Sequence, residues 1–384
     1  MRKILILVVV PLVALVATVV ITRHLIPDEV LDPGPVRLGA ITTLTGPGAT
    51  YGKRFFLGME LGVQQANAPG DVEETGSEKP LVEIYPIDDA SDPARAKDAF
   101  HTLVKEHRVQ AIIGPISVES TRATAGLAEE LGVIVLPPVA ADLDGPGGFR
   151  LWPSVEITAG YIARTATEKF HAKRIAVLRA EVFPGGTEHE QAVTRALGQL
   201  DGSIVASETF PWQAKDTHEV IERLAGASPE LLVLLGAGSK EAVRLFADTR
   251  LAGLSIPVLA DDACYGEPLL EAGPLLDGFY FASMSLSPDE ETARLTRQFG
   301  EYFRERHGEA PDAQVAAGYA AIDILVRAIG HGGRSTDEIA RSLRGEDWST
   351  VFGRVQFDAS GNNVGAEYRL FRVTHDKQAV PAEP

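Results

Sequence analysis

The stretch VRLGAITTLTGPGATYGKRFFLGMELGVQQAN, which runs from Val36 to Asn67, decides the fold. Its first residues place apolar side chains at alternating positions, Val36, Leu38 and Ala40, as is typical of a strand. A turn rich in hydroxyl groups and glycine follows over residues 42–48. The stretch therefore predicts a strand that leads into a polar loop.

A helix is predicted directly after this loop. Phe56, Met59, Val63 and Ala66 recur at about one-turn spacing and would form its apolar face, packed back on the sheet. In open α/β sheets, ligands bind where strands lead into helices. If the loop faces such a crevice, the residues expected to face a ligand are Thr45, Gly48, Thr50 and Tyr51.

Two interpretations of the loop compete. Gly46, Gly48 and Gly52 fit a loose G-x-G-x-x-x-G pattern, which in an NAD-dependent oxidoreductase lets the backbone approach a pyrophosphate. The longer run G-x-x-x-x-L-T-G-P-x-A-x-Y-G, followed by a G-x-E-L-x-x-x-x-x-N helix, is more specific. It resembles the opening of the substrate-binding proteins of branched-chain amino-acid (Leu/Ile/Val) ABC transporters, which are type I periplasmic binding proteins.

Composition limits the classes of function. A length of 384 residues favours two domains. A net charge of −17 without a Lys/Arg cluster makes nucleic acid an unexpected partner, because phosphate binding needs basic patches. The one cysteine, Cys264, excludes an intrachain disulfide framework and a cysteine-based zinc cluster.

The N-terminus predicts export. Arg2 and Lys3 precede an apolar run from Ile4 to Ile21, as in the basic and apolar regions of a signal peptide. No A-x-A cleavage site stands out, and no cysteine is present there for lipid attachment. The run also reaches the lower length limit of a membrane-spanning helix. A removed signal and an uncleaved anchor therefore remain equal alternatives, and residues 1–35 are expected to be one of these plus a linker.

Start and stop signals divide the next part of the chain into helices. Asp92 and Ser117 are placed to cap two helices, and Gly132 is placed to end the second of them. Strand patterns lie between these helices, so the sheet is expected to be parallel and doubly wound. The inward face expected for the second helix consists of Ala123, Leu127 and Leu131.

The same alternation restarts at Phe149 and predicts a second α/β lobe. Two long helices, Glu290–His307 and Gln314–Ile329, then follow with no strand between them. The segment from Phe352 to Asn362 is expected to be a hairpin around an Asp-Ala-Ser-Gly turn. We assign residues 36–152 with 286–350 to the first lobe and 153–285 with 351–376 to the second.

The resemblance extends over nearly the whole chain after the leader. GPISVESTRATAGLAEELGVIVLPPVAA is similar to the family's G-P-x-S-S helix and following strand, and GFRLWPSVEITAGYIA to its F-R-x-x-P-S-D crossover. FGRVQFDASGNNVG is similar to its F-G-x-x-x-F-D-x-x-G-D tail. The resemblance implies an α/β fold of two doubly wound parallel-sheet lobes, joined by a three-strand hinge and preceded by an N-terminal apolar helix. The lobes would close on a small ligand.

Residues that match the family's motifs carry expected roles. Tyr51 stands where the family has an aromatic residue that packs against the ligand, and Phe183 where it has an aromatic wall. Asp262 stands where it has an acid that pairs with an ammonium group; the alternative is a solvated loop acid beside Asp261. Trp152 is expected to pack at the hinge rather than in the site.

Other positions depart from the family and point to a different ligand. Val118 and Ala141 replace two hydroxyls that hold an amino-acid carboxylate, and Ser239 stands near a missing tyrosine. Each lost hydrogen bond to a charged acceptor is worth about 1 kcal/mol or more. Ser117 could substitute for one of them if its loop shifts. We therefore expect an amide, an aromatic compound or another less polar solute. The expected ligand-binding residues are Tyr51, Ile116, Ser117, Val118, Ala141, Phe183, Ser239 and Asp262.

Motifs of catalysis do not accompany these residues. No Tyr-x-x-x-Lys, H-E-x-x-H or G-x-S-x-G is present, and Glu188, His189 and Glu190 are expected to be solvated rather than metal ligands. We expect an exported, monomeric solute-binding protein that delivers a small molecule to an ABC permease, with no cofactor and no metal. The alternatives are a ligand-sensing module of a membrane-associated signalling system and, with less support, an NAD-dependent oxidoreductase.

Overall fold

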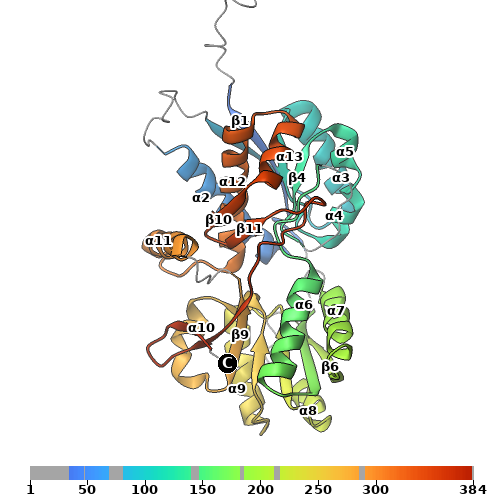
Figure 1. The fold of residues 1–384 in the computed structure, drawn as a ribbon, viewed down its shortest axis with the longest axis vertical. Helices are drawn as coiled ribbons and strands as arrows, with labels where there is room; N and C mark the ends of the chain where they lie inside the picture. The colour runs from blue at the N-terminus through green and yellow to red at the C-terminus, as the bar shows by residue number, and fades with distance from the viewer. Residues whose placement is uncertain are drawn as a thin grey trace, which may run out of the picture.

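The computed structural model describes residues 34–46, 48–68, 81–139, 147–181, 186–211, 217–284 and 290–382. The expected N-terminal apolar helix lies outside these residues. Within them the chain forms two lobes, one above the other along the longest axis of the molecule (Figure 1). Each lobe is built on its own sheet, so the expected pair of α/β lobes is confirmed.

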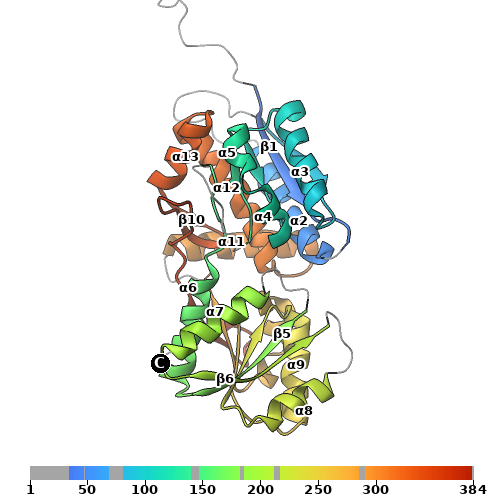
Figure 2. The ribbon, with the colours of Figure 1, turned by 90° about the vertical axis from the view of Figure 1, so that its right-hand side faces the viewer.

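The first lobe has a four-stranded, fully parallel sheet in the order β2-β1-β3-β4. Helices cover it on both sides (Figures 1 and 2). Its strands are β1 (Val36–Thr42), β2 (Val82–Asp88), β3 (Ala111–Ile113) and β4 (Ile134–Leu136). Its helices are α2 (Ala49–Ala66), α3 (Pro93–Thr102) continued by the π-helical turn η1 (Leu103–His107), α4 (Val118–Thr124), α5 (Leu127–Leu131), α11 (Glu290–His307), α12 (Ala313–Gly332) and α13 (Thr336–Gly345).

The core of the first lobe is centred on the close contact between α2 and α12. A Cβ atom on Gly58 would overlap the carbonyl oxygen of Val315, and one on Gly318 would overlap that of Phe55, so only glycine lets the two helices approach this closely. Helix α12 is long and apolar enough to cross a membrane, but 67% of its most apolar window is buried inside the lobe. It is the central core helix of this lobe.

The second lobe has a seven-stranded sheet in the order β13-β12-β9-β8-β7-β5-β6. Its first five strands in the chain are parallel, whereas β12 runs antiparallel to β9, and β13 antiparallel to β12. These antiparallel strands, and β9 itself, were not predicted. The strands are β5 (Arg174–Ala180), β6 (Ser203–Phe210), β7 (Leu231–Leu235), β8 (Val258–Ala260), β9 (Phe279–Ser283), β12 (Arg369–Val373) and β13 (Ala379–Pro381).

Helices lie on both faces of this second sheet, as in a doubly wound fold (Figures 1 and 2). They are α6 (Val155–Arg164) continued by the π-helical turn η2 (Thr165–Lys169), α7 (Gly186–Gly198), α8 (His218–Gly226), α9 (Ser239–Leu251) and α10 (Glu267–Glu271), with the 3-10 turns η3 (Asp262–Cys264) and η4 (Gly273–Leu275).

Two connections between the lobes are bonded to each other. Arg150 and Asn362 form a parallel bridge, in which the Arg150 guanidinium also donates to the Asn362 side chain. The side-chain amide of the buried Asn363 donates to the carbonyl oxygen of Leu151 at 2.9 Å. A further connection runs through residues 285–289, which lie outside the described ranges. The two bonded connections therefore run side by side at the hinge.

The C-terminal hairpin differs from the expected one. Strand β10 (Asp347–Thr350) pairs with β11 (Gly353–Gln356), upstream of the Asp-Ala-Ser-Gly turn. Across the turn itself the expected pairing is short: Phe357 and Asn363 form an antiparallel bridge, and the amide of Val364 donates to the carbonyl oxygen of Gln356. The expected lobe boundary at residue 350 would place β11 in the second lobe. However, Val355 and Phe357 are buried in the core of the first lobe. We therefore place the boundary after Phe357.

Two helices bury faces that differ from the expected ones. In α2, Met59 is buried as expected, but Phe55 is buried and Phe56 only partly so. The helix expected after Ser117 is divided into α4 and α5, and it buries Thr121 and Thr124. Their hydroxyl groups donate to main-chain carbonyl oxygens one turn back, so a threonine can occupy an inward position without an unpaired polar group. The caps expected at Asp92, Ser117 and Gly132 are confirmed.

Candidate functional site

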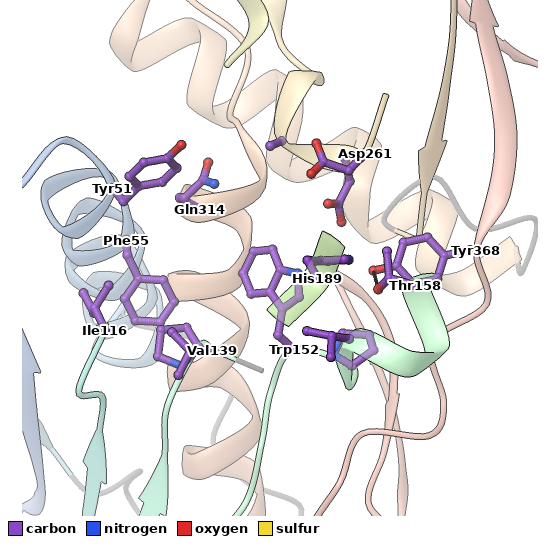
Figure 3. Close-up of a pocket in the computed structure, with 15 residues that line it drawn as sticks. Tyr51, Phe55, Ile116, Val139, Trp152, Thr158, His189, Asp261, Gln314 and Tyr368 are labelled. Atoms are coloured by element: carbon purple, nitrogen blue, oxygen red, sulfur yellow. Dashed lines mark hydrogen bonds between the residues drawn. The ribbon is translucent and has the colours of Figure 1, made fainter. Parts of the chain in front are cut away.

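A cavity lies between the two lobes and the first interlobe connection. Its volume is about 90 Å³, several times the roughly 10–15 Å³ that one water needs on the same measure. The first lobe supplies residues from α2, α12 and the loops after β3 and β4; the second supplies residues from α6, α7 and the turn after β8. Figure 3 shows Tyr51, Phe55 and Gln314 on one side and Asp261, His189 and Tyr368 on the other.

The first-lobe wall depends on how α2 begins. Gly48, with φ of 81°, precedes the helix, and a Cβ on Gly52 would overlap the carbonyl oxygen of Thr43. Glycine at these positions lets the first turn of α2 pack on the end of β1. Tyr51 and Phe55, four residues apart on this helix, then both line the cavity.

The polar loop before α2 is occupied by its own hydrogen bonds. One carboxylate oxygen of Asp88 accepts from the amides of Leu44 and Thr45, and the other accepts from the Thr45 hydroxyl at 2.6 Å. These bonds lower the pKa of Asp88 to about 2, although its partial burial opposes the shift. Of the four loop residues expected to face a ligand, only Tyr51 lines the cavity. Amides that are already bonded in this way do not favour the dinucleotide interpretation.

Aromatic and hydroxyl groups form the hinge side of the cavity. Trp152 lines it and also packs on Phe352, with ring centroids 4.5 Å apart, so it belongs to both the hinge and the site. The Thr158 hydroxyl donates to the Tyr368 hydroxyl oxygen at 2.9 Å. Burial raises the pKa of Tyr368 well above its usual value, so this phenol stays neutral.

Two adjacent acids, Asp261 and Asp262, close the second-lobe side. They follow β8, and their side chains are 1% and 8% exposed. Burial raises the pKa of Asp261 to about 8, with a further contribution from the charge of Asp262, and burial raises the pKa of Asp262 to about 7. Each carboxyl group is therefore easily protonated near neutral pH, and a cation beside them would favour the charged form.

Direct contacts join the lobes around the cavity. The Tyr51 hydroxyl donates to the carbonyl oxygen of Gly236, and the amide of Gly236 donates to the Asp261 carboxylate at 2.7 Å. On the surface, Arg122 of α4 pairs with Glu188 of α7 at 3.1 Å. These contacts span the gap that would have to open to admit a ligand.

The expected site residues separate into three groups. Tyr51, Ile116 and Asp262 line the cavity. Ser117, Val118 and Ser239 are not among its lining residues, and Ala141 and Phe183 lie outside the described residues.

The three residues away from the cavity have structural contacts instead. Ser117 accepts a hydrogen bond from the amide of Ser120 as the cap of α4. Val118 is buried against Val139, which itself lines the cavity. The Ser239 hydroxyl accepts from the amide of Leu269 at the start of α10.

Several lining residues were not predicted. His189 was expected to be solvated, but it is buried, and burial lowers its pKa to about 4, so the imidazole is neutral. Its neighbours do meet solvent and pair with arginines: Glu188 with Arg122, and Glu190 with Arg179. The other lining residues that no motif indicated include Phe55, Thr158, Asp261, Gln314 and Tyr368.

Known proteins resemble this chain over most of its length. The model of the periplasmic binding protein family matches residues 35–378. The Leu/Ile/Val/Thr-binding protein of Salmonella typhimurium is 23% identical over 345 residues, which cover 88% of this chain and 90% of that protein.

Solved structures are similar in fold. The branched-chain amino acid transporter substrate binding protein LivJ from Streptococcus pneumoniae, in complex with isoleucine, has a TM-score of 0.71 at 22% identity and covers 90% of this chain and 97% of that one. A solute binding protein of an ABC transporter from R. palustris, in complex with benzoate, has a TM-score of 0.72 at 18% identity, with coverage of 91% and 96%.

Proposed function

This chain belongs to the periplasmic binding protein family, and from that membership we propose that it is the extracytoplasmic solute-binding protein of a branched-chain amino-acid-type ABC transporter. It captures a small amino acid, amide or aromatic solute between its lobes and presents the closed form to a membrane permease. The relatives named above support this role through the functions that their names state. We further propose that the chain acts as a monomer.

The observation that carries the proposal is the cavity between the lobes. Most of its wall is apolar or aromatic, and a small number of polar groups point to it from different elements. Ligand sites in proteins have this composition, because apolar walls supply burial and the polar groups fix orientation. No Lys or Arg is among the described residues that line it.

Closure follows from contacts made only when the lobes meet. The Tyr51 hydroxyl and the Arg122–Glu188 pair each join an element of the first lobe to one of the second. An open form lacks these contacts and exposes the cavity. A solute that touches both walls binds the closed form better and therefore shifts the population toward it.

A binding screen of the full chain in mild detergent tests the proposal. Trp152 lines the cavity, so intrinsic fluorescence should report both binding and thermal unfolding. A solute at a hundredfold excess over its dissociation constant should add about 2.7 kcal/mol of stability. Amino acids, amides, amines, aromatic acids and nicotinamide cofactors form the panel. A shift with NAD alone, or with no small solute, would contradict the proposal.

Partner and location have tests of their own. We expect the mature chain outside the cytoplasmic membrane, and the mass of its N-terminus should show whether residues 1–35 are removed. Co-purification with a permease should require the solute, since the closed form is the one delivered. A complex that forms equally well without solute would argue for a sensing partner instead.

A further inference from the structure

A groove on the second lobe lies apart from the cavity between the lobes. Its volume is about 440 Å³, against about 90 Å³ for that cavity, and it is open to solvent. The described residues that line it all belong to the second lobe: Lys169, Tyr280, Arg372, Pro381 and Ala382. Binding in this groove therefore does not require the lobes to close.

The groove forms where the helix that covers this face of the sheet ends. Helix α6 shares a core with Leu370 of β12, but its continuation η2 ends at Lys169, and the chain then turns back through His171 into β5. Two residues beyond Leu370, on the same face of the strand, Arg372 is exposed. Strand β12 lies between β9 and β13, so Arg372 is not on an edge strand. The opening lets a charged side chain on an inner strand stay solvated, whereas its burial without a partner would be costly.

Strand register brings Arg372 next to an aromatic ring. Strands β12 and β9 are antiparallel with Phe371 opposite Phe281, so the next pair in register is Arg372 and Tyr280. The Cβ atoms of side chains directly opposite in such a pair are about 4.5–5.5 Å apart. Phe170 packs edge-on against the Tyr280 ring, with centroids 4.9 Å apart. The Arg372 guanidinium therefore lies beside a ring that packing holds in place.

A second cation reaches the groove from a different element. The Lys169 ammonium donates to the carbonyl oxygen of Ala382 at 2.6 Å, which fixes its position beside the end of β13. Partial burial lowers the pKa of Lys169, and an anion beside it would favour the charged form. The Arg372 side chain has no hydrogen bond or ion pair within the described part of the chain. Two cations thus meet in one groove of a chain whose net charge is −17.

These groups suit a carboxylate on a flat apolar body. A guanidinium presents paired N–H donors that match the two oxygens of a carboxylate, and an ammonium adds a compact charge. The Tyr280 ring offers an aromatic surface, and aromatic pairs attract each other in stacked or edge-to-face arrangements. An inorganic anion would use the two charges but leave the ring uncovered. The combination therefore favours an aromatic carboxylate over phosphate.

We propose that this groove is a second binding site, which takes a small aromatic carboxylate: Arg372 binds the carboxylate, Lys169 adds charge, and Tyr280 packs against the ring of the ligand. This inference goes beyond the proposed solute-binding function, because the groove contains no described residue of the interlobe cavity. The chain then has two sites for small molecules. Occupancy of one closes the lobes, whereas occupancy of the other leaves their separation unchanged.

Photolabelling locates the site directly. The full chain in mild detergent is irradiated with 4-azidobenzoate, and tandem mass spectrometry assigns the labelled residues. We expect label on residues of β9, β12 or η2 around the groove, and we expect benzoate to suppress it better than phosphate at equal ionic strength. Label confined to the interlobe cavity would overturn the inference. Suppression by phosphate as strong as that by benzoate would also overturn it.

Variants assign the binding to Arg372. The measured quantity is the benzoate concentration that halves the label in the groove. Arg372→Gln should raise it about fivefold or more, because the paired donors and the charge are lost. Arg372→Lys keeps the charge but not the fork of donors, and should give an intermediate value. Arg369→Gln, on the same strand but outside the groove, removes an equal charge and should leave it unchanged.

The remaining outcomes separate this inference from the proposed function. If Arg372→Gln has no effect, or no more effect than Arg369→Gln, the inference is wrong, since circular dichroism shows whether each variant is folded. Trp152 lines the interlobe cavity and reports on that site alone. Groove labelling without any solute response of Trp152 would count against the proposed function only. A Trp152 response without groove labelling would count against this inference only.

Discussion

The hydroxyl group of Tyr51 lies 3.2 Å from the carbonyl oxygen of Gly236 and donates a hydrogen bond to it across the gap between the lobes. The amide of the same Gly236 donates to Asp261. One residue of the second lobe thus links an aromatic ring of the first lobe to the buried acid. The position of Asp261 and the closure of the lobes are therefore coupled through a single peptide segment.

Removing this hydroxyl should weaken closure. In Tyr51→Phe the ring stays in the wall, but the Gly236 carbonyl loses its partner, at a cost of about 1 kcal/mol. Solute affinity should fall about fivefold, and small-angle scattering should show a more open average shape. Tyr302→Phe, on α11 outside the cavity, is the control. Unchanged affinity and shape in Tyr51→Phe would mean that the bond does not contribute to closure.

The surface ion pair between Arg122 and Glu188 should contribute little to the closure of the lobes. Arg122 and Glu188 are 55% and 41% exposed, so water and salt screen their attraction. A double-mutant cycle with Arg122→Ala and Glu188→Ala, measured through solute affinity, should give a coupling of about 0.2–1 kcal/mol. The coupling should vanish in about 1 M salt, where the screening length is about 3 Å. A larger coupling that persists in salt would contradict this expectation.

The buried acids should make the empty protein less stable as the pH rises. Asp261 has a pKa raised from 3.8 to about 8, so between these values the folded state holds more protons than the unfolded chain. The free energy of unfolding then falls with rising pH. His189, with its pKa lowered from 6.5 to about 4, acts in the opposite direction only between those values.

A pH series of urea unfolding curves measures this effect. From pH 6.5 to 8.5 the stability of the empty protein should decline, and Asp261→Asn should reduce the decline. Asp277→Asn, the exposed control, should show the decline of the unsubstituted chain. A flat profile in the unsubstituted chain would mean that the acids are not held in their protonated form.

Glycine at the contact between α2 and α12 should be essential for stability. Gly318→Ala places a Cβ against the carbonyl oxygen of Phe55 and should cost about 3 kcal/mol or more, because the helices have to move apart. Gly300→Ala, at a half-buried position of α11 with open space around the added Cβ, should instead stabilise by about 0.5–1 kcal/mol. Urea midpoints compare the two. Equal midpoints would contradict the close packing of these helices.

Local signals in the sequence predicted much of the fold. Asp92, Ser117 and Gly132 act at helix ends through short-range hydrogen bonds and backbone conformation, so their residue types indicate their positions. Alternation of strands and helices likewise gave the two lobes. The inward face of α4 escaped prediction, because Thr121 satisfies its hydroxyl within the helix and can be buried like an apolar residue.

Strand β9 and the pairing of β11 depend on distant parts of the chain. Strand β9 lies between β8 and β12, and β12 comes from the far end of the sequence. Strand β11 pairs with β10, because its apolar residues belong to the first-lobe core. No local pattern encodes such partners. Residue spacing therefore predicted strands and helices, but it did not predict which strands pair at the edges of the sheets.

The candidate site could be predicted only in part. Tyr51, Ile116 and Asp262 sit in the cavity wall, at positions that the family's motifs indicate. The Ser239 hydroxyl instead accepts a hydrogen bond at the start of α10, because a hydroxyl can bond whichever amide the fold brings near it. His189 and Tyr368 come from a helix and a late connection that only the fold brings together. The burial of these two side chains shifts their pKa values. That burial cannot be deduced from the residues next to them in the sequence.

The edge of the second sheet has a consequence for biosynthesis. Strand β12 lies far downstream of β9 in the chain and is synthesised well after it, yet β12 covers the free edge of β9. While the chain is still emerging, β9 has no partner on that side, whereas β1 to β4 are complete after the first third of translation. The second sheet therefore gains its last partner much later in synthesis than the first, and the edge of β9 is the part of the fold that waits longest for its neighbour.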